Sequence, residues 1–452
     1  MKDTIAIYHD DNLRYPKDPF DAASIIRNGI DYILSELTGE RIDREWNPLG
    51  KLVSKGSKII IKPNFVTIKD HHFELNSDRQ LAVTTNNSLI VPIIEYAYKA
   101  VGDNGKIIIA DSPIEASDFD KTVSKLGVLH IVEEFQKRGY PVELVDLRDF
   151  RVKPIQIINN LRLGNRSFNL GLFIKKSLPG DNSGYSTIDL LEKSAFNNHK
   201  GINKLRFYKP HYKKPLEAHF DNHHKYNLAN SILEADLIIN LPKMKTHKIS
   251  GVTLALKNLI GLTNKKYWLP HYTEGYMSSG DQYDHEPKMS ERIQNFLRVI
   301  PIGFGNSIFI RYPITIEESQ QVQMPIYNGS WIKNDTLWRT ILDVAKVVEY
   351  SDKTGNLAET KQRKVLSIID GVIAGEGNGP LGATAKYCNV LLGSMNMYHL
   401  DFLATKMMGF NTHKIKYLKD IQERDINYTC NQSKLPGFKF VTPERWAGLY
   451  EK

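Results

Sequence analysis

The apolar positions of the chain fall into short continuous runs and longer runs with helical spacing. The short runs predict strands at Thr4–Tyr8, Lys58–Ile61, Lys106–Ala110, Val142–Val145, Leu237–Ile239, Val365–Ile369 and Cys388–Leu392. The longer runs predict helices at Asp21–Leu37, Ser88–Val101, Val252–Ile260, Thr336–Val348 and Asp401–Met408. Because strands and helices alternate, we expect an α/β fold with a mainly parallel sheet and helices on both faces.

Two stretches lack this alternation and predict irregular insertions into the α/β core. Residues 151–233 are polar and rich in Asn, Lys and His, and we expect partial β structure there. Residues 265–330 are aromatic and contain histidines, and they could form a wall or a lid over a site. The predicted core segments are 1–150, the central strand–loop–helix 234–264 and 331–415, followed by a C-terminal tail, 416–452.

The central segment combines a buried strand with a high density of basic residues. Pro242 donates no ladder hydrogen bond, so it predicts the end of the strand. The basic residues that follow are Lys243, Lys245, His247, Lys248 and Lys257. A strand, a basic loop and a helix N-terminus form a natural anion site, because unpaired N–H groups and positive charges meet there. A solvated basic loop between two core elements is the alternative interpretation.

The blocks around these lysines resemble those of a known family. Lys243-Met244-Lys245-Thr246-His247, Gly251-Val252-Thr253 and Leu256-Lys257-Asn258-Leu259-Ile260-Gly261 are similar to the signature of the DUF362 family, a domain of unknown function. Further blocks with a similar counterpart in that family are Lys62-Pro63-Asn64-Phe65, Thr84-Thr85, Asp111-Ser112-Pro113 and residues 334–339. The resemblance implies an α/β fold and leaves the reaction open, because the role of the family is largely unassigned.

Five blocks place polar residues after predicted strands, and the carboxyl ends of parallel strands meet at one edge of a sheet. We therefore predict a single site at that edge. The predicted substrate-binding residues are Lys62, Asn64, Thr84, Thr85, Ser112, Lys243, Lys245, Thr246, Asn258, Arg339, Gly377 and Asn378. The predicted catalytic residues are His247, Lys257, Asp111, Asp370 and Glu376. Local roles are the alternatives: helix capping for Asp111 and the threonines, and an ion pair with Asp335 or Asp343 for Arg339.

The predicted site joins several cations to several carboxylates, and the cations suit a phosphate or carboxylate substrate. His247 is the expected general acid or base, because the unperturbed pKa of histidine lies near neutrality. Lys257 is the expected electrophilic or covalent lysine. These residues predict an enzyme that acts on a small anionic substrate. A non-catalytic protein that binds an anionic ligand or a polyanion surface is an alternative.

A remoter resemblance suggests another alternative. His247 stands ten residues before Lys257, which is the separation of the catalytic histidine and the cofactor-holding lysine in the lactate racemase family. Members of that family use a nickel-pincer nucleotide. His271 follows where a metal-ligating histidine would lie, whereas Leu254-Ala255 replaces that family's glycine pair. The resemblance implies a metal- or cofactor-dependent isomerase or oxidoreductase, with His247 and His271 as candidate metal ligands.

Composition narrows the function classes. The 452 residues are 41% hydrophobic and 25% charged, which is ordinary for a globular protein, and the net charge is +9. That charge suits a small anionic partner, whereas the lack of a long basic tract argues against nucleic acid. The two cysteines, Cys388 and Cys430, are too few for an iron–sulfur cluster or a Cys-rich zinc site. The sequence specifies neither a cofactor nor an oligomeric state.

No targeting segment is predicted. Residues 1–11 contain acidic side chains where a signal peptide needs an apolar core. No stretch reaches the ~18–20 apolar residues of a membrane span. Two cysteines in a chain of this length suit a reducing compartment, so we expect a cytoplasmic protein.

His219, His223 and His224 form the densest histidine group of the chain. No H-E-x-x-H pattern accompanies them, so we interpret the group as a solvated face instead of a zinc site.

Overall fold

The computed structural model describes most of the 452-residue chain. The described residues are 3–66, 77–163, 166–208, 213–289, 292, 299–303, 306–311, 328–422, 428–430, 435–446 and 448–450. Parts of the second predicted insertion, including 312–327, and parts of the predicted tail lie outside them. None of the helices within these ranges combines the length and the apolar character that crossing a lipid bilayer requires.

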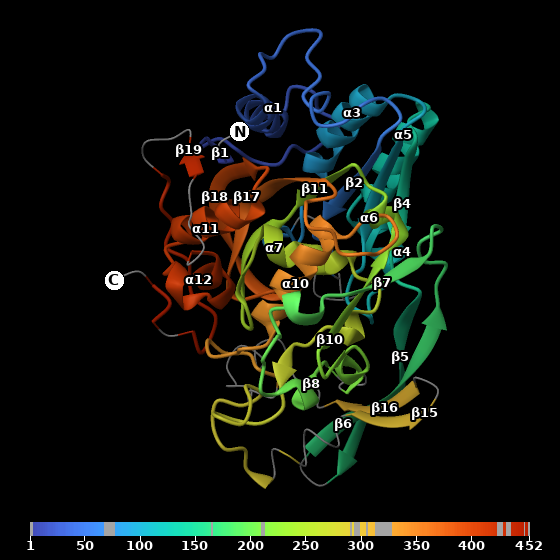
Figure 1. The fold of residues 1–452 in the computed structure, drawn as a ribbon, viewed down its shortest axis with the longest axis vertical. Helices are drawn as coiled ribbons and strands as arrows, with labels where there is room; N and C mark the ends of the chain where they lie inside the picture. Colours follow the sequence, from blue (N-terminus) through green and yellow to red (C-terminus); the bar gives the residue numbers. More distant parts are fainter. Residues whose placement is uncertain are drawn as a thin grey trace.

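A mixed sheet forms the centre of the molecule (Figure 1). Its strand order is β19 (Tyr428–Cys430), β1 (Asp3–His9), β18 (Gly382–Ser394), β17 (Lys364–Asn378), β11 (Leu237–Leu241), β2 (Lys58–Pro63), β3 (Lys106–Asp111) and β4 (Val142–Asp146). The strands from β17 to β4 in this order pair in parallel, whereas β18 is antiparallel to both β17 and β1. The predicted α/β class with a mainly parallel sheet is confirmed.

Strand β2 shows why the sheet is covered on both faces. The side chains of Ile59 and Ile61 belong to one hydrophobic core and that of Ile60 to the other, and all three are fully buried. Alternate side chains of a strand point to opposite faces, so a continuous apolar run needs helices on each side. The helices that contribute to the core of Ile59 include α1 (Ile25–Thr38), α3 (Ile90–Val101), α4 (Phe119–Lys125) and α5 (Val128–Lys137). Those that contribute to the core of Ile60 include α7 (Ala255–Asn258), α10 (Leu337–Tyr350), α11 (Met397–Met407) and α12 (Lys416–Gln422).

The remaining helices are short. Within the described residues they are α2 (Asp78–Leu81) and α6 (Asn230–Leu233), with the 3-10 turns η1 (Asn87–Leu89), η2 (Leu191–Lys193), η3 (Ile202–Lys204), η4 (Lys214–Glu217), η5 (Leu259–Leu262), η6 (Lys266–Trp268) and η7 (Thr412–Lys414).

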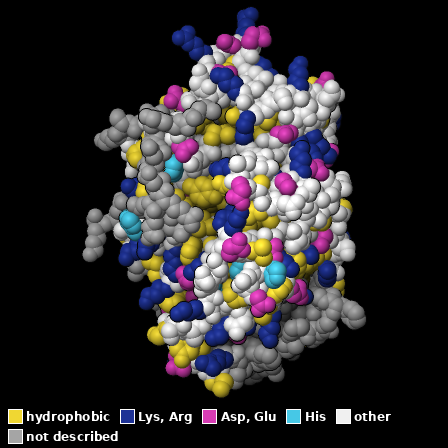
Figure 2. Space-filling view, in the orientation of Figure 1, with side chains coloured by type: hydrophobic (Ala, Val, Ile, Leu, Met, Phe, Trp, Pro, Cys, Tyr) yellow, Lys and Arg dark blue, Asp and Glu magenta, His cyan; other side chains and the backbone are white. Residues whose placement is uncertain are grey.

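On the face drawn in Figure 2, basic and acidic side chains are interspersed, so no patch of one sign dominates that face.

The predicted basic loop is in fact a buried strand. After Pro242 the chain continues as β12 (Lys243–His247), which pairs in parallel with β17 and antiparallel with β13 (Gly251–Thr253). Pro242 cannot donate to the ladder, but its carbonyl accepts from the backbone N–H of Asp370 at 2.9 Å. The proline therefore ends the pairing of β11 without ending the extended chain. The helix predicted from Val252 begins only at Ala255, because β13 takes up the residues before it.

Strands from both predicted insertions pair in a second, antiparallel sheet, seen at the lower right of Figure 1. Its order is β15 (Val299–Gly303), β16 (Asn306–Arg311), β6 (Arg166–Ser177) and β5 (Phe150–Leu163). Two small sheets contain β7 (Tyr185–Asp189), β10 (His223–Ala229) and β9 (His219–Phe220), and β14 (Tyr272–Thr273) and β8 (Leu205–Arg206). Because β14 pairs with β8 and β16 with β6, the two insertions are joined by strand pairing.

Two of the three clustered histidines are buried, so the predicted solvated face is wrong for His219 and His224. The Nδ1 atoms of these residues lie 3.3 Å apart, and Nε2 of His219 lies 3.1 Å from the carbonyl oxygen of Trp268. A carbonyl only accepts, so Nε2 of His219 donates to it and its Nδ1 accepts from His224. The pair is a satisfied hydrogen-bond arrangement within the fold.

Candidate functional site

A cavity of about 490 Å³ opens at the carboxyl ends of β2 and β3, beside β12 and α7. The predicted site residues that line it are Lys62, Asn64, Asp111, Ser112, Lys245, His247, Lys257, Asn258, His271 and Asn378. Residues from β2, β3, β12 and α7 thus meet at one edge of the sheet, as parallel strand ends do in open α/β folds.

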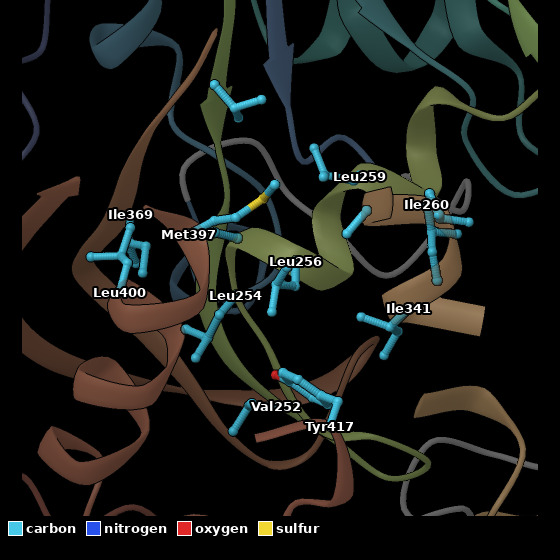
Figure 3. Close-up of a cluster of buried hydrophobic side chains, with 14 of the residues drawn as sticks. Val252, Leu254, Leu256, Leu259, Ile260, Ile341, Ile369, Met397, Leu400 and Tyr417 are labelled. Atoms are coloured by element: carbon cyan, nitrogen blue, oxygen red, sulfur yellow. The ribbon is translucent and has the colours of Figure 1, made fainter. Parts of the chain in front are cut away.

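The short helix α7 places its residues by burying its other side in the core. Figure 3 shows Leu254, Leu256 and Leu259 among apolar side chains of neighbouring elements, including Ile341 of α10 and Leu400 of α11. Packing on this side leaves Lys257 and Asn258 to line the cavity. The apolar spacing that predicts a helix here therefore also orients the two polar residues.

Lys62 and Asp111 form a buried ion pair in the cavity wall. The Nζ of Lys62 lies 3.0 Å from Oδ1 of Asp111, and the backbone N–H of Phe65 donates to Oδ2 of Asp111 at 3.1 Å. Burial lowers the pKa of Lys62, and the neighbouring carboxylate opposes that shift. A Cβ at Gly261 would lie 2.4 Å from Oδ1 of Asp111 and 2.5 Å from Cε of Lys62. Only glycine at 261 leaves room for the pair.

Lys245 is held by neutral groups. Its Nζ donates to Oδ1 of Asn64 at 3.0 Å and to the carbonyl oxygen of Val83 at 2.5 Å. Asn64 in turn donates to Asn258 at 2.7 Å, and Asn258 donates to Asn240 at 2.8 Å. This chain of amides orients the ammonium without compensating its charge. Burial, with Lys257 and Lys243 nearby, places the pKa of Lys245 well below its ordinary value.

Lys257 and Lys266 add positive charge to the cavity without forming an ion pair among the described residues. Neither side chain makes a hydrogen bond or an ion pair with another described residue. Burial lowers the pKa of Lys257 to about 8, with a further contribution from Lys62, and burial lowers the pKa of Lys266 to about 7. Glu115 also lines the cavity, but burial raises its pKa to about 8, so it carries little negative charge near neutrality. The cavity therefore has an excess of positive charge.

Two hydroxyl groups complete the polar lining. The side-chain oxygens of Ser112 and Thr253 are buried and have no hydrogen-bond partner among the described residues. Both residues line the cavity. Buried polar atoms almost always have a hydrogen-bond partner in native proteins. Two buried hydroxyls that lack a partner, in a cavity lined by lysines, therefore indicate a bound polar group.

His247 and His271 line the same cavity with opposite hydrogen-bonding patterns. The Nδ1 of His247 accepts from the backbone N–H groups of Ile249 and Ser250 at 3.1 and 3.3 Å, which leaves the proton on Nε2. The Nδ1 of His271 lies 2.9 Å from the carbonyl oxygen of Leu269, so this atom donates and Nε2 carries a lone pair. One neutral imidazole is a donor and the other is an acceptor.

The charge of the cavity keeps both imidazoles neutral. Burial and the neighbouring Lys257 place the pKa of His247 well below its ordinary value. Burial lowers the pKa of His271 to about 3, with an opposing contribution from its bond to Leu269. Since Nδ1 of His247 is already an acceptor, this residue can donate a proton or a hydrogen bond through Nε2 but cannot accept one there. The predicted role of His247 as a base is thus restricted by its neighbours.

The predicted helix N-terminus is already occupied by a side chain of the protein and is not open to a ligand anion. The backbone N–H groups of Ala255 and Leu256 donate to the two carboxylate oxygens of Asp401 at 2.7 and 3.0 Å. Asp401 lies on α11, and its carboxyl group caps α7 from within the core. The positive character of the site comes from lysine side chains instead of from a helix end.

A second buried cluster holds predicted residues that do not line the cavity. The Nζ of Lys243 lies 3.0 Å from Oδ2 of Asp370, and Tyr15 donates to Oδ1 of the same carboxylate at 2.6 Å. Lys243 also donates to the Tyr15 oxygen at 2.7 Å, and the backbone N–H of Asn86 donates to Asp370 at 3.0 Å. Both charges are paired and fully buried, so Lys243 and Asp370 join β12 to β17.

Other predicted residues support the fold without lining the cavity. Thr85 donates to the carbonyl oxygen of Leu241, and Thr84 bonds to Gln80 within one turn. Thr246 donates to the carbonyl oxygen of Gly377 at 2.8 Å. Thr84, Thr85, Thr246 and Gly377 are not among the residues that line the cavity.

Glu376 and Arg339 also lie outside the cavity lining. Glu376 pairs with Lys386 at 3.2 Å and accepts from the backbone N–H of Val441. Arg339 pairs with Asp335 at 2.9 Å, one turn earlier on α10, which matches the local alternative for that residue.

Several lining residues had no sequence signal. Thr253 lies in a block that resembles the family but was not predicted as a site residue, Lys266 belongs to no motif, and much of the apolar wall comes from the insertions. That wall includes Val152, Phe173, Phe207, Tyr208 and Leu269. Aromatic density in 265–330 predicted a wall in general terms, but β5 and β6 supply part of it from a distant segment. Among the described residues, no group of three or more His, Cys, Asp or Glu side chains is arranged to hold a metal ion.

A family model described as Domain of unknown function (DUF362) matches residues 172–406. The chain belongs to the DUF362 family. The matched range contains Lys245, His247, Lys257 and His271, whereas Lys62 and Asp111 precede it. The remoter resemblance to the lactate racemase family is not confirmed.

One curated relative of this DUF362 protein is the Thylakoid-associated protein sll1697 of Synechocystis sp.. The two are 20% identical over 219 residues, which are 48% of this chain and 46% of the relative. The chain thus spans about half the length of the curated relative that it matches. No solved structure matches this DUF362 protein.

Proposed function

We propose that this DUF362 protein binds a small carboxylate or phosphorylated molecule in the basic cavity and is an enzyme acting on it. The observation that carries the proposal is that Lys257 and Lys266 line the cavity without an ion-pair partner among the described residues, beside two unpaired hydroxyls. Uncompensated buried charge is costly, and a bound anion would supply the missing partner. The apolar wall of Phe173, Phe207 and neighbouring residues would contact the remainder of the ligand.

The proposed chemistry follows from the protonation states. Lys257, with a pKa of about 8, is partly neutral near physiological pH and is suited to act as a nucleophile or proton acceptor. Nε2–H of His247 would donate to an oxygen that gains negative charge during the reaction. Lys62, Lys245 and Lys266 would hold the anion, and Asp111 would fix the position of Lys62.

Isothermal titration calorimetry with inorganic phosphate and with small phosphate monoesters tests the anion site. We expect Lys257→Gln and Lys266→Gln each to weaken binding by about tenfold or more, since a charge-assisted hydrogen bond contributes roughly 1.5–3 kcal/mol. Arg339→Gln is the matched control, because Arg339 is a cation outside the cavity lining, and its dissociation constant should stay within about twofold of the parent. Equal effects of all three variants would contradict the proposal.

A turnover screen separates the enzyme from a non-catalytic binding protein. Compounds that bind are incubated with the parent and with Lys257→Arg, which retains the charge and lacks a titratable amine near neutrality. We expect turnover by the parent and loss of turnover in Lys257→Arg with binding retained. Binding without any conversion would favour the non-catalytic alternative.

A cofactor-dependent isomerase or oxidoreductase is the second candidate. Its supporting observation is His271, which lines the cavity with Lys257 and whose Nδ1 bond to Leu269 leaves Nε2 with a lone pair suited to a metal ion. Elemental analysis and the absorption spectrum of freshly purified protein test it. Absence of both metal and chromophore after anaerobic reconstitution would exclude it.

A further inference from the structure

We infer that the ligand of the basic cavity carries a hydroxyl group next to its anionic group, and that His247 and His271 recognise these two parts. Nε2–H of His247 donates to an oxygen of the anion, and Nε2 of His271 accepts the hydroxyl proton. The inference rests on the proposed function, since it specifies the class of anion that the same cavity binds.

The acceptor character of His271 is built into its surroundings. Its Nδ1 donates to the carbonyl oxygen of Leu269 at 2.9 Å, and its backbone N–H donates to the carbonyl oxygen of Arg206 at 2.9 Å. The rings of Phe207 and Tyr208 pack against the imidazole, each with a centroid separation of 4.8 Å. Turning the ring over would put Cδ2 in the place of Nδ1 and break the bond to Leu269, so Nδ1 keeps its proton and Nε2 keeps the lone pair.

The donor character of His247 is equally constrained. Two backbone N–H groups, from Ile249 and Ser250, converge on its Nδ1. Protonating Nδ1 would place three hydrogens against one another, so Nε2 keeps the proton. The turn that supplies these N–H groups connects β12 to β13, and their pairing at His247 and Gly251 holds it in place.

These two patterns discriminate among anions. A simple anion has only acceptors, and it can satisfy the lysines, His247 and the hydroxyls of Ser112 and Thr253. It would displace water from the lone pair of His271 without providing a donor in its place, which costs free energy. A neighbouring hydroxyl provides that donor, and sites built to hydrogen-bond a hydroxyl reject analogues that lack it. Hydroxy carboxylates and polyol phosphates share this chemistry.

Matched probe pairs test the inference by calorimetry at fixed ionic strength with a chelator present. The phosphate pair is glycerol 3-phosphate and propyl phosphate, and the carboxylate pair is glycerate and propionate. We expect the hydroxylated member of at least one pair to bind about 3- to 10-fold more tightly, as one net hydrogen bond of roughly 0.5–1.5 kcal/mol implies. The pair with the larger ratio identifies the anionic group.

Variants at position 271 test whether the affinity ratio within a probe pair depends on His271. His271→Phe should bring the ratio to about one, and His271→Gln, whose amide oxygen can accept near the position of Nε2, should restore part of it. Arg339→Gln should keep the parent's ratio. A ratio that survives His271→Phe would overturn the inference.

Nitrogen-15 NMR of labelled histidine side chains provides a readout without ligand. Comparison of the parent with His271→Phe and His247→Phe assigns the two rings, and we expect the Nδ1–H form for His271 and the Nε2–H form for His247. The reverse assignment at either position overturns the inference. Equal binding of both members of each pair would overturn it while leaving the anion site intact. Binding of no probe, inorganic phosphate included, would overturn the proposed function as well.

Discussion

The ammonium of Lys62 lies 3.0 Å from a carboxylate oxygen of Asp111, and both side chains are almost fully buried. The two residues lie at the carboxyl ends of adjacent parallel strands, β2 and β3, which pair from Lys58 and Lys106 to Ile61 and Ile109. Neighbouring strand ends thus supply a cation and its counterion to the same cavity. Because this pair is internally compensated, the excess charge of the cavity comes from Lys245, Lys257 and Lys266.

Asp111→Asn should destabilise the protein strongly. The substitution leaves the buried ammonium of Lys62 without its counterion, and breaking one partner of a buried pair typically costs about 3–5 kcal/mol. Chemical denaturation at neutral pH measures the free energy of unfolding. The matched control is Glu143→Gln, which removes the carboxylate from the exposed pair with Lys106 and should change stability by less than about 1 kcal/mol. Equal effects of the two substitutions would contradict the importance of burial.

Gly261→Ala should disturb the same ion pair from the opposite side. The added methyl group would lie 2.4 Å from Asp111 and 2.5 Å from Lys62, so the pair or the backbone must shift. We expect a loss of about 1–3 kcal/mol in the free energy of unfolding and weaker phosphate binding. Gly437→Ala is the control, since a Cβ there meets nothing within 4 Å. Unchanged stability in Gly261→Ala would show that residue 261 and the Lys62–Asp111 pair can move apart at little cost in free energy.

Anion affinity should fall as the pH rises from 6 to 9.5. The pKa of Lys266 is lowered to about 7 and that of Lys257 to about 8, mainly by burial, so both ammonium groups lose their protons in this range. A lysine that must be protonated weakens binding by up to about tenfold per pH unit above its pKa. Sulfate is the suitable probe in calorimetry, because its charge is constant over this range.

Lys257→Arg isolates the contribution of one lysine to this pH dependence. Arginine stays charged throughout, so the decline in sulfate affinity above pH 8 should be smaller than in the parent. An affinity for sulfate that is independent of pH in the parent would argue against the two lysines as ligands.

Trp446→Ala should destabilise the turn between β12 and β13. Nε1 of Trp446 donates to the carbonyl oxygen of Lys248 at 2.9 Å, and a Cβ at Gly251 would lie 3.0 Å from its ring. Trp446 is buried, so we expect a loss of about 3–5 kcal/mol in the free energy of unfolding. Trp446→Phe keeps an aromatic ring and loses the donor, and should cost only about 1–3 kcal/mol. Equal losses would assign the effect to the hydrogen bond alone.

Local patterns predicted the elements well and the roles of individual lysines poorly. Lys243 and Lys245 stand two residues apart on β12, and the sequence treats them alike. A register irregularity between their pairings with β17 separates them, so Lys243 meets Asp370 and Lys245 reaches the cavity. The cap of α7 was equally hidden, because Asp401 lies almost 150 residues after Ala255.

Local sequence patterns specify the α/β class, the strands and the polar residues at their carboxyl ends, because apolar periodicity and turn residues act over short distances. Which charges cancel depends on the folded chain. Lys62 with Asp111 and Lys243 with Asp370 are compensated, whereas Lys257 and Lys266 are not, and this depends on distances between remote segments and on burial. The protonation pattern of His247 and His271 likewise arises from the backbone groups that the fold brings to each ring.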